Sequence, residues 1–193
     1  QVATKQKRVV FAFHKPKGVV TTRSDERGRK TIFDVLPAEL AGLKGLHSVG
    51  RLDLATTGLL LLTNDTRLSA WLTAPESEVP RRYVVTVRGE FTAQKCEQME
   101  SGIPSPVGRL VARSAQVQKQ SGKETQLLIE LTEGKNREIR RLCEALGHEV
   151  TGLKRLSYGE IQLATLGLGE VREILGSELE RAFPGHPKAT TLI

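Results

Sequence analysis

Residues 47–64 read HSVGRLDLATTGLLLLTN, and the interpretation of the whole chain starts from this stretch. Four consecutive leucines, Leu59–Leu62, lie between Gly58 and Thr63. A short apolar run bounded by small and polar residues predicts a strand that is buried on both faces. Asp53 precedes the run in a turn of small residues, where a packed strand can hold its carboxylate in place for chemistry. The alternative is an ordinary turn aspartate that accepts backbone N–H bonds.

Length and composition exclude several classes of protein. The 193 residues suffice for one domain with a sizeable core or for two small lobes. No apolar run reaches membrane-spanning length, so we expect a soluble, cytoplasmic protein without a membrane partner. Cys96 and Cys143 lie far apart, which favours buried thiols over a disulfide or a zinc site. The histidines lack ligand spacing and no phosphate-binding glycine motif occurs, so we expect neither a metal nor a cofactor.

The positive charge is concentrated at the start of the chain. The net charge is +7, from 29 basic and 22 acidic residues. Residues 1–30 hold nine basic side chains against two acidic ones, an excess equal to that of the whole chain. Such asymmetry predicts a polyanionic partner. We expect residues 1–8 to form a basic, flexible tail, with direct contact to nucleic acid as the alternative for that tail.

The pattern of elements favours an α+β fold. Alternating and β-branched residues predict strands at 9–13, 19–22, 82–88, 110–118 and 125–131, with one or two more within 159–171. Helical spacing and capping residues predict a helical turn at 31–36 and helices after Asp65, over 92–99, from Asn136 to Gly147 and from Ser177. Irregular alternation with hairpin-like turns predicts a mixed, mainly antiparallel sheet. We expect residues 9–183 to form the domain and 184–193 a loose tail.

A cluster of basic side chains begins the predicted helix after residue 136, comprising Lys135, Arg137, Arg140 and Arg141. Cations near a helix N-terminus oppose the macrodipole. The cluster therefore indicates a functional reason, such as contact with phosphate or pairing with a carboxylate. The alternative is a solvated face that Glu138 and Glu144 balance.

Several segments, in this order along the chain, resemble those of pseudouridine synthases, in particular the RsuA-type branch that modifies ribosomal RNA. They are FHKPKGVV at 13–20, GRLD with TTGLLLLTND at 50–65, RRYVVTV at 81–87 and EGKNREIRR at 133–141. The resemblance covers roughly residues 9–175, so it is far more specific than one four-letter match. It implies a mixed sheet with a central cleft between two lobes.

The resemblance also implies roles for three residues. Asp53 corresponds to the catalytic nucleophile, and Tyr83 to the tyrosine that packs on the target base. Arg140 corresponds to the basic residue that pairs with the aspartate, although Arg141 is adjacent and stays open as the alternative. The chain departs from the family at Ala55, where Asp or Asn is frequent. That change removes a turn-capping side chain and leaves Asp53 in place.

The implied partner is RNA, either ribosomal RNA or a ribosomal assembly particle, bound by a protein for which a monomer is favoured. The residues expected to contact it are Arg51, Lys15, Lys17, Lys135, Asn136, Arg137 and Arg141. Many members carry a small N-terminal RNA-binding domain of the S4 type. We expect none ahead of Val9 in this chain, either because this member lacks it or because it has been lost. The rival interpretation is a catalytically silent RNA-binding or ribosome-assembly protein. A hydrolase would usually require a second catalytic carboxylate, and no second acidic residue has comparable support from a motif.

Overall fold

The computed structural model describes residues 7–135 and 137–189. The strands are β1 Val10–Lys15, β2 His47–Ser48, β3 Thr57–Thr63, β4 Arg81–Arg88, β5 Ser114–Gln120, β6 Glu124–Leu131, β7 Val150–Tyr158, β8 Ile161–Gln162 and β9 Val171–Glu173. The helices are α1 Ile32–Val35, α2 Ala38–Ala41, α3 Thr66–Thr73, α4 Ala93–Ser101, α5 Glu138–Ala145 and α6 Gly176–Ala182, with a 3₁₀ turn at Pro75–Ser77. No helix in the described part is long and apolar enough to span a bilayer.

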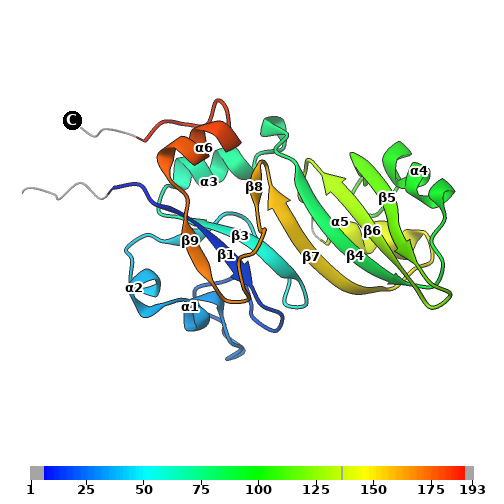
Figure 1. Ribbon diagram of the computed structural model, residues 1–193, viewed down its shortest axis with the longest axis horizontal. Helices are drawn as coiled ribbons and strands as arrows, with labels where there is room; N and C mark the ends of the chain where they lie inside the picture. The colour runs from blue at the N-terminus through cyan, green and yellow to red at the C-terminus, as the bar shows by residue number, and fades with distance from the viewer. Residues whose placement is uncertain (1–6, 136, 190–193) are drawn as a thin grey trace, which may run out of the picture.

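In the described residues the strands form one nine-stranded sheet in the order β5-β6-β4-β7-β3-β1-β9, with β2 beside β3 and β8 beside β7 (Figure 1). All the strand pairs are antiparallel except β3 with β7. The predicted α+β class with a mixed, mainly antiparallel sheet is therefore confirmed.

The sheet consists of two halves that pack against different helices. In one half, α3 and α6 cover one face of β1 and β3, and α1 covers the other face. In the other half, α4 and α5 pack on the strands β4 to β6. Figure 1 shows this division, with α5 behind β4 and β6 and with α3 and α6 grouped beside β3. Cys96 and Cys143 are buried, free thiols in the second half, as the sequence predicts.

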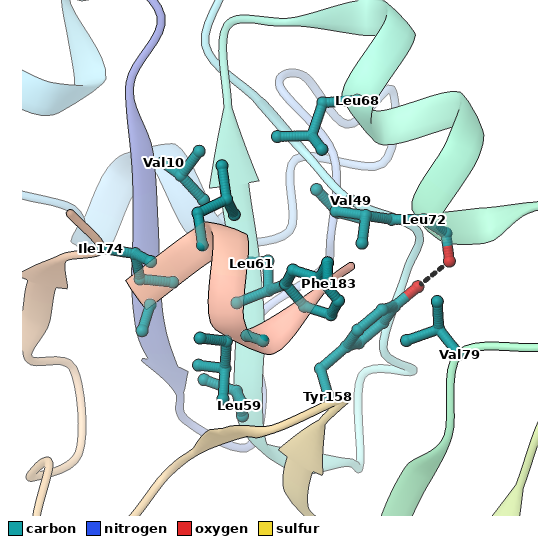
Figure 2. Close-up of a cluster of buried hydrophobic side chains, with 14 of the residues drawn as sticks. Val10, Val49, Leu59, Leu61, Leu68, Leu72, Val79, Tyr158, Ile174 and Phe183 are labelled. Atoms are coloured by element: carbon teal, nitrogen blue, oxygen red, sulfur yellow. Dashed lines mark hydrogen bonds between the residues drawn. The ribbon is translucent and has the colours of Figure 1, made fainter. Parts of the chain in front are cut away.

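The leucine run forms β3 and is buried on both faces, as predicted. Leu59 and Leu61 point into the cluster under α3 and α6, while Leu60 and Leu62 point into the cluster under α1. The alternation follows the two-residue period of a strand. Figure 2 shows the first cluster, where the hydroxyl of Tyr158 donates a 2.8 Å hydrogen bond to the Leu72 carbonyl at the end of α3.

In the described residues, two backbone pairs connect β3 of one half to β7 of the other, Thr57 with Lys154 and Gly58 with Arg155. A Cβ on Gly58 would lie 2.2 Å from the Arg155 carbonyl oxygen, so the strands can approach this closely only at a glycine. Gly58 also has φ +108°, a conformation that favours glycine. Beyond this pair the strands diverge, and Arg155 Nε donates a 2.7 Å hydrogen bond to the Leu59 carbonyl. This side-chain hydrogen bond takes the place of the next backbone hydrogen bond between β3 and β7, which the diverging strands do not form.

Two predictions about strands were wrong. Residues 19–22 do not form a hairpin strand with β1, because β3 and β9 already occupy both edges of β1. Val20 instead makes one isolated bridge to Thr31. The strand β7 was missed, since its sequence VTGLKRLSY contains glycine and two adjacent basic residues in place of a regular alternation.

Helix boundaries and termini also differ from expectation. The N-cap of α6 is Leu175, so the spacing at Ser177 does not mark a capping box. The N-cap of α5 is Arg137, and the predicted cap Asn136 lies outside the described residues. Arg8, the last residue of the predicted N-terminal tail, contacts Pro187. Its guanidinium donates a 2.7 Å bond to the Pro187 carbonyl, which also ties down the start of the expected C-terminal tail.

We predict that Gly58→Ala lowers the free energy of unfolding by about 3 kcal/mol or more, because the methyl group meets backbone and the residue must keep a positive φ. Urea unfolding of the purified chain measures the change. Gly122→Ala is the matched control, since open space surrounds Gly122 and its φ is not positive. Equal stability of the two variants would contradict the assigned role of the strand junction.

Candidate active site

A cleft of about 200 Å³ lies beside the strand junction. Its lining comes from the loop between β2 and β3, from the start of β4, from the segment that leads into α5, and from β7. The residues that carry chemistry there are Arg51, Asp53, Arg81, Tyr83, Lys135, Arg137, Glu138, Arg140, Arg155 and Tyr158. These positions are spread over more than 100 residues of sequence, and the two half-sheets bring them together.

Two arginines approach the Asp53 carboxylate. Arg140 Nε and Arg137 Nη1 each lie 3.7 Å from Asp53 Oδ2. The Arg140 contact is the one that the resemblance led us to expect. A separation of 3.7 Å gives an ion pair without a hydrogen bond, and Arg140 Nε accordingly has no hydrogen-bond partner. Both arginines thus place positive charge beside the Asp53 carboxylate.

Tyr83 lines the same cleft from β4. It is half-buried, and in the sheet it pairs with Arg155 of β7 on one side and Ile129 of β6 on the other. Its side chain packs against the apolar clusters of both halves, so the ring is a rigid surface that can support a flat ligand.

Lys15 is not on an RNA-binding surface, which corrects the prediction. It is fully buried, and its Nζ donates to the carbonyls of Pro16 at 3.0 Å, Asp53 at 3.1 Å and Thr56 at 2.9 Å. Burial lowers the pKa of Lys15 to about 8, against the opposing effect of the Asp53 charge. The ammonium group binds the two ends of the turn that carries Asp53. Its role in the structure is therefore to position that turn.

The other predicted RNA contacts occupy varied environments. Arg51 and Arg137 are exposed at the cleft, and Lys17 is exposed beside the Asp53 turn, where Gly18 N donates to the Leu54 carbonyl. Lys135 lines the cleft, but its ammonium already bonds the Arg109 carbonyl and the Glu133 carboxylate. Arg141 is half-buried on α5. Asn136 lies outside the described residues.

The sequence analysis missed three charged residues in the cleft. Arg81 and Arg155 are both nine-tenths buried or more, and each sits on a strand. Glu138 is buried as well, and desolvation together with the charge of Glu133 raises its pKa to about 7. The signal available for the arginines was weak, because basic residues in strands usually face solvent. Glu138 was interpreted only as a balancing surface charge.

The described residues contain no group of three or more side chains suited to bind a metal ion.

We predict that Lys15→Met lowers the free energy of unfolding by about 2–3 kcal/mol, because buried carbonyl groups of the turn lose their donor. Lys17→Met is the matched control for stability, two residues away and exposed. Chemical unfolding measures both variants. Unchanged stability of Lys15→Met would show that the turn does not depend on this ammonium.

Comparison with known proteins identifies a family and several relatives of the chain. Residues 9–145 match the family described as RNA pseudouridylate synthase. Ribosomal large subunit pseudouridine synthase B of Bacillus subtilis (strain 168) is 36% identical over 187 residues, which cover 93% of this chain and 74% of that protein. Its namesake in Yersinia pestis is 43% identical over 154 residues, covering 80% of this chain and 48% of that protein. The chain therefore spans about half the length of the Yersinia relative.

Solved structures agree. The crystal structure of a pseudouridylate synthase matches with a TM-score of 0.77 and 31% identity, over 93% of this chain and 75% of that one. An archaeal box H/ACA Nop10–Cbf5 complex matches with a TM-score of 0.59 at 18% identity, over 80% of this chain and 48% of that one, and shows a shared fold alone. The family match and the Bacillus relative confirm the family that the motifs indicated. The chain belongs to the RNA pseudouridylate synthase family.

Proposed function

We propose that this chain isomerises a uridine of ribosomal RNA to pseudouridine in the cytoplasm, with Asp53 as the nucleophile. The observation that carries the proposal is the position of the Asp53 carboxylate, 3.7 Å from Arg140 and from Arg137, in a cleft that Tyr83 also lines. The relatives named ribosomal large subunit pseudouridine synthase B support ribosomal RNA as the substrate class.

The reaction exchanges one bond to the sugar for another. The Asp53 carboxylate attacks C1′ of the target nucleotide, the C1′–N1 bond breaks, and its electron pair stays on the uracil. The base then turns so that C5 faces C1′. C5 forms the new bond, the carboxylate is released, the hydrogen on C5 leaves as a proton, and N1 takes up a proton, so the product is an isomer of the uridine. No electrons are gained or lost overall, so these residues can carry the steps without a redox cofactor.

The surroundings of Asp53 suit these steps. The two arginines place positive charge beside the carboxylate that attacks C1′. The target uridine must leave its stack to reach the carboxylate, because the reacting atoms are inaccessible within a helix. An extruded base can stack on the Tyr83 ring. Lys15 holds the turn below Asp53, so the nucleophile needs little rearrangement when the nucleotide arrives.

Exposed cations at the cleft would hold the RNA backbone. Arg51 and Arg137 line the opening, and Lys17 lies beside the Asp53 turn. Contacts with phosphate supply most of the affinity in such complexes and position the strand.

We predict that Asp53→Asn preserves folding and RNA binding and lowers the rate of pseudouridine formation by at least about 10³-fold, because the amide cannot act as the nucleophile. Pseudouridine release assays on a ribosomal RNA fragment with the purified chain measure the rate. Asp25→Asn is the matched control, an aspartate in the loop before α1 that pairs with Arg29 and does not line the cleft. Near-normal turnover by folded Asp53→Asn would refute the assignment.

We also predict that RNA affinity falls steeply with salt, because bound cations release counterions from phosphate. Arg137→Gln and Lys17→Gln should each reduce the slope of log affinity against log salt by roughly one. Lys119→Gln serves as the control, since it is exposed on β5 at the far end of the sheet. Slopes that do not distinguish the three variants would place the RNA on another surface.

A further inference from the structure

Two buried guanidinium groups line the cleft, in addition to the arginines that pair with Asp53. Arg81 on β4 and Arg155 on β7 are each 4% exposed, and both line the cleft. Their central carbon atoms each lie 4.9 Å from the centre of the Tyr158 ring. Tyr158 is itself 1% exposed, so this part of the cleft is its closed end.

The hydrogen bonds of the two arginines are incomplete. Arg81 Nη2 donates to the Leu72 carbonyl at 3.0 Å and to the Tyr158 hydroxyl at 2.9 Å. Arg155 Nε donates to the Leu59 carbonyl. Arg81 Nη1 and Arg155 Nη2 are buried and have no acceptor. Among residues 7–135 and 137–189, no carboxylate lies within ion-pair distance of either arginine.

This arrangement is unfavourable for the protein alone. A buried charge is costly unless a partner or hydrogen bonds compensate it, and here two like charges flank one ring. Neutral core residues would fill the same space at lower cost. The arginines are therefore best explained by a ligand that brings negative charge and hydrogen-bond acceptors to the closed end.

The position of the arginines indicates which part of a nucleotide they meet. A nucleotide within an RNA chain has to enter the cleft base first, because the backbone on both sides of it remains outside. The exposed cations Arg51 and Arg137 lie where phosphates would pass. The buried pair would then face the oxygens O2 and O4 of the uracil. These are acceptors before the reaction, and they share the electron pair of N1 once the C1′–N1 bond has broken.

We propose that Arg81 and Arg155 form an oxyanion site for the uracil base and stabilise the uracil anion released when its bond to the sugar breaks. The inference rests on the proposed function and deepens it. No proton moves to the arginines. Their unpaired N–H groups donate to the base oxygens while the electron pair resides on the ring, and the pair then forms the new bond between C5 and C1′. Donors fixed in a closed site need no reorganisation as this charge develops.

The first test uses the acidity of the leaving base. RNA with either uridine or 5-fluorouridine at the modified position is reacted in single turnover with Arg81→Gln, Arg155→Gln and wild type, and consumption of the target nucleoside is followed. Fluorine withdraws electrons and makes the base anion more stable by itself. We expect each variant to lose about 100-fold in rate with uridine. With 5-fluorouridine the loss should be at least tenfold smaller.

Two matched controls accompany these variants. Arg82→Gln changes the exposed arginine next to Arg81, which pairs with Glu130, and Lys154→Gln changes the neighbour of Arg155 on β7. Both should react with uridine at close to the wild-type rate. A merely structural role of Arg81 and Arg155 would give the same loss factor with both bases, and that result overturns the inference. Wild type that makes no pseudouridine at all would instead overturn the proposed function.

The second test needs no variant, so a failure of either arginine variant to fold does not affect it. Free 5-fluorouracil is added to wild type and its fluorine NMR signal is followed across pH. We expect the bound base to ionise at least one pH unit below the free base, with excess inorganic phosphate causing no release. A bound base that ionises like the free one, no detectable binding, or displacement by phosphate would each contradict a site for the base anion, and the last would indicate a phosphate site.

Discussion

The close contact between β3 and β7 at Gly58 and Arg155 is the constraint on which the rest of the structure depends. It joins two half-sheets that have separate cores, and only a glycine permits the approach. The turn that carries Asp53 lies just before Gly58, and Arg155 reaches across the point where the strands diverge. One backbone contact therefore aligns the proposed nucleophile with the opposite wall of the cleft.

The cationic side chains in and around the cleft differ in how deeply they are buried. At the opening, Arg137 is half-exposed beside Asp53, and Arg140 approaches the same carboxylate from a more buried position. Beside the turn that carries Asp53, the ammonium of the fully buried Lys15 donates three hydrogen bonds to backbone carbonyls. Cations that face solvent suit a polyanionic strand, whereas cations in a closed space suit charge that develops during a reaction. Under the proposed function, cationic side chains would serve binding, positioning and catalysis according to their burial.

The sequence predicted what depends on local pattern. The leucine run, the Asp65 cap and the amphipathic face of α5 all follow from short-range spacing. Lys15 was misplaced because a lysine beside Pro-x-Gly looks like a surface turn, and its burial depends on carbonyls that lie 38 to 41 residues away. The sequence analysis did not predict the strand β7 or the burial of Arg155, because both depend on pairing with strands that are distant in sequence. The Asp53–Arg140 pair was expected from the resemblance alone, since no periodicity connects residues so far apart.

The account makes one central claim, that this cleft converts uridine to pseudouridine through Asp53. The most direct measurement is a map of pseudouridines in ribosomal RNA from cells with the gene, without it, and with it restored as wild type or as Asp53→Asn. The account predicts that a defined ribosomal RNA position loses its pseudouridine on deletion and regains it only with the wild-type chain. An unchanged map on deletion, or restoration by Asp53→Asn, would contradict it.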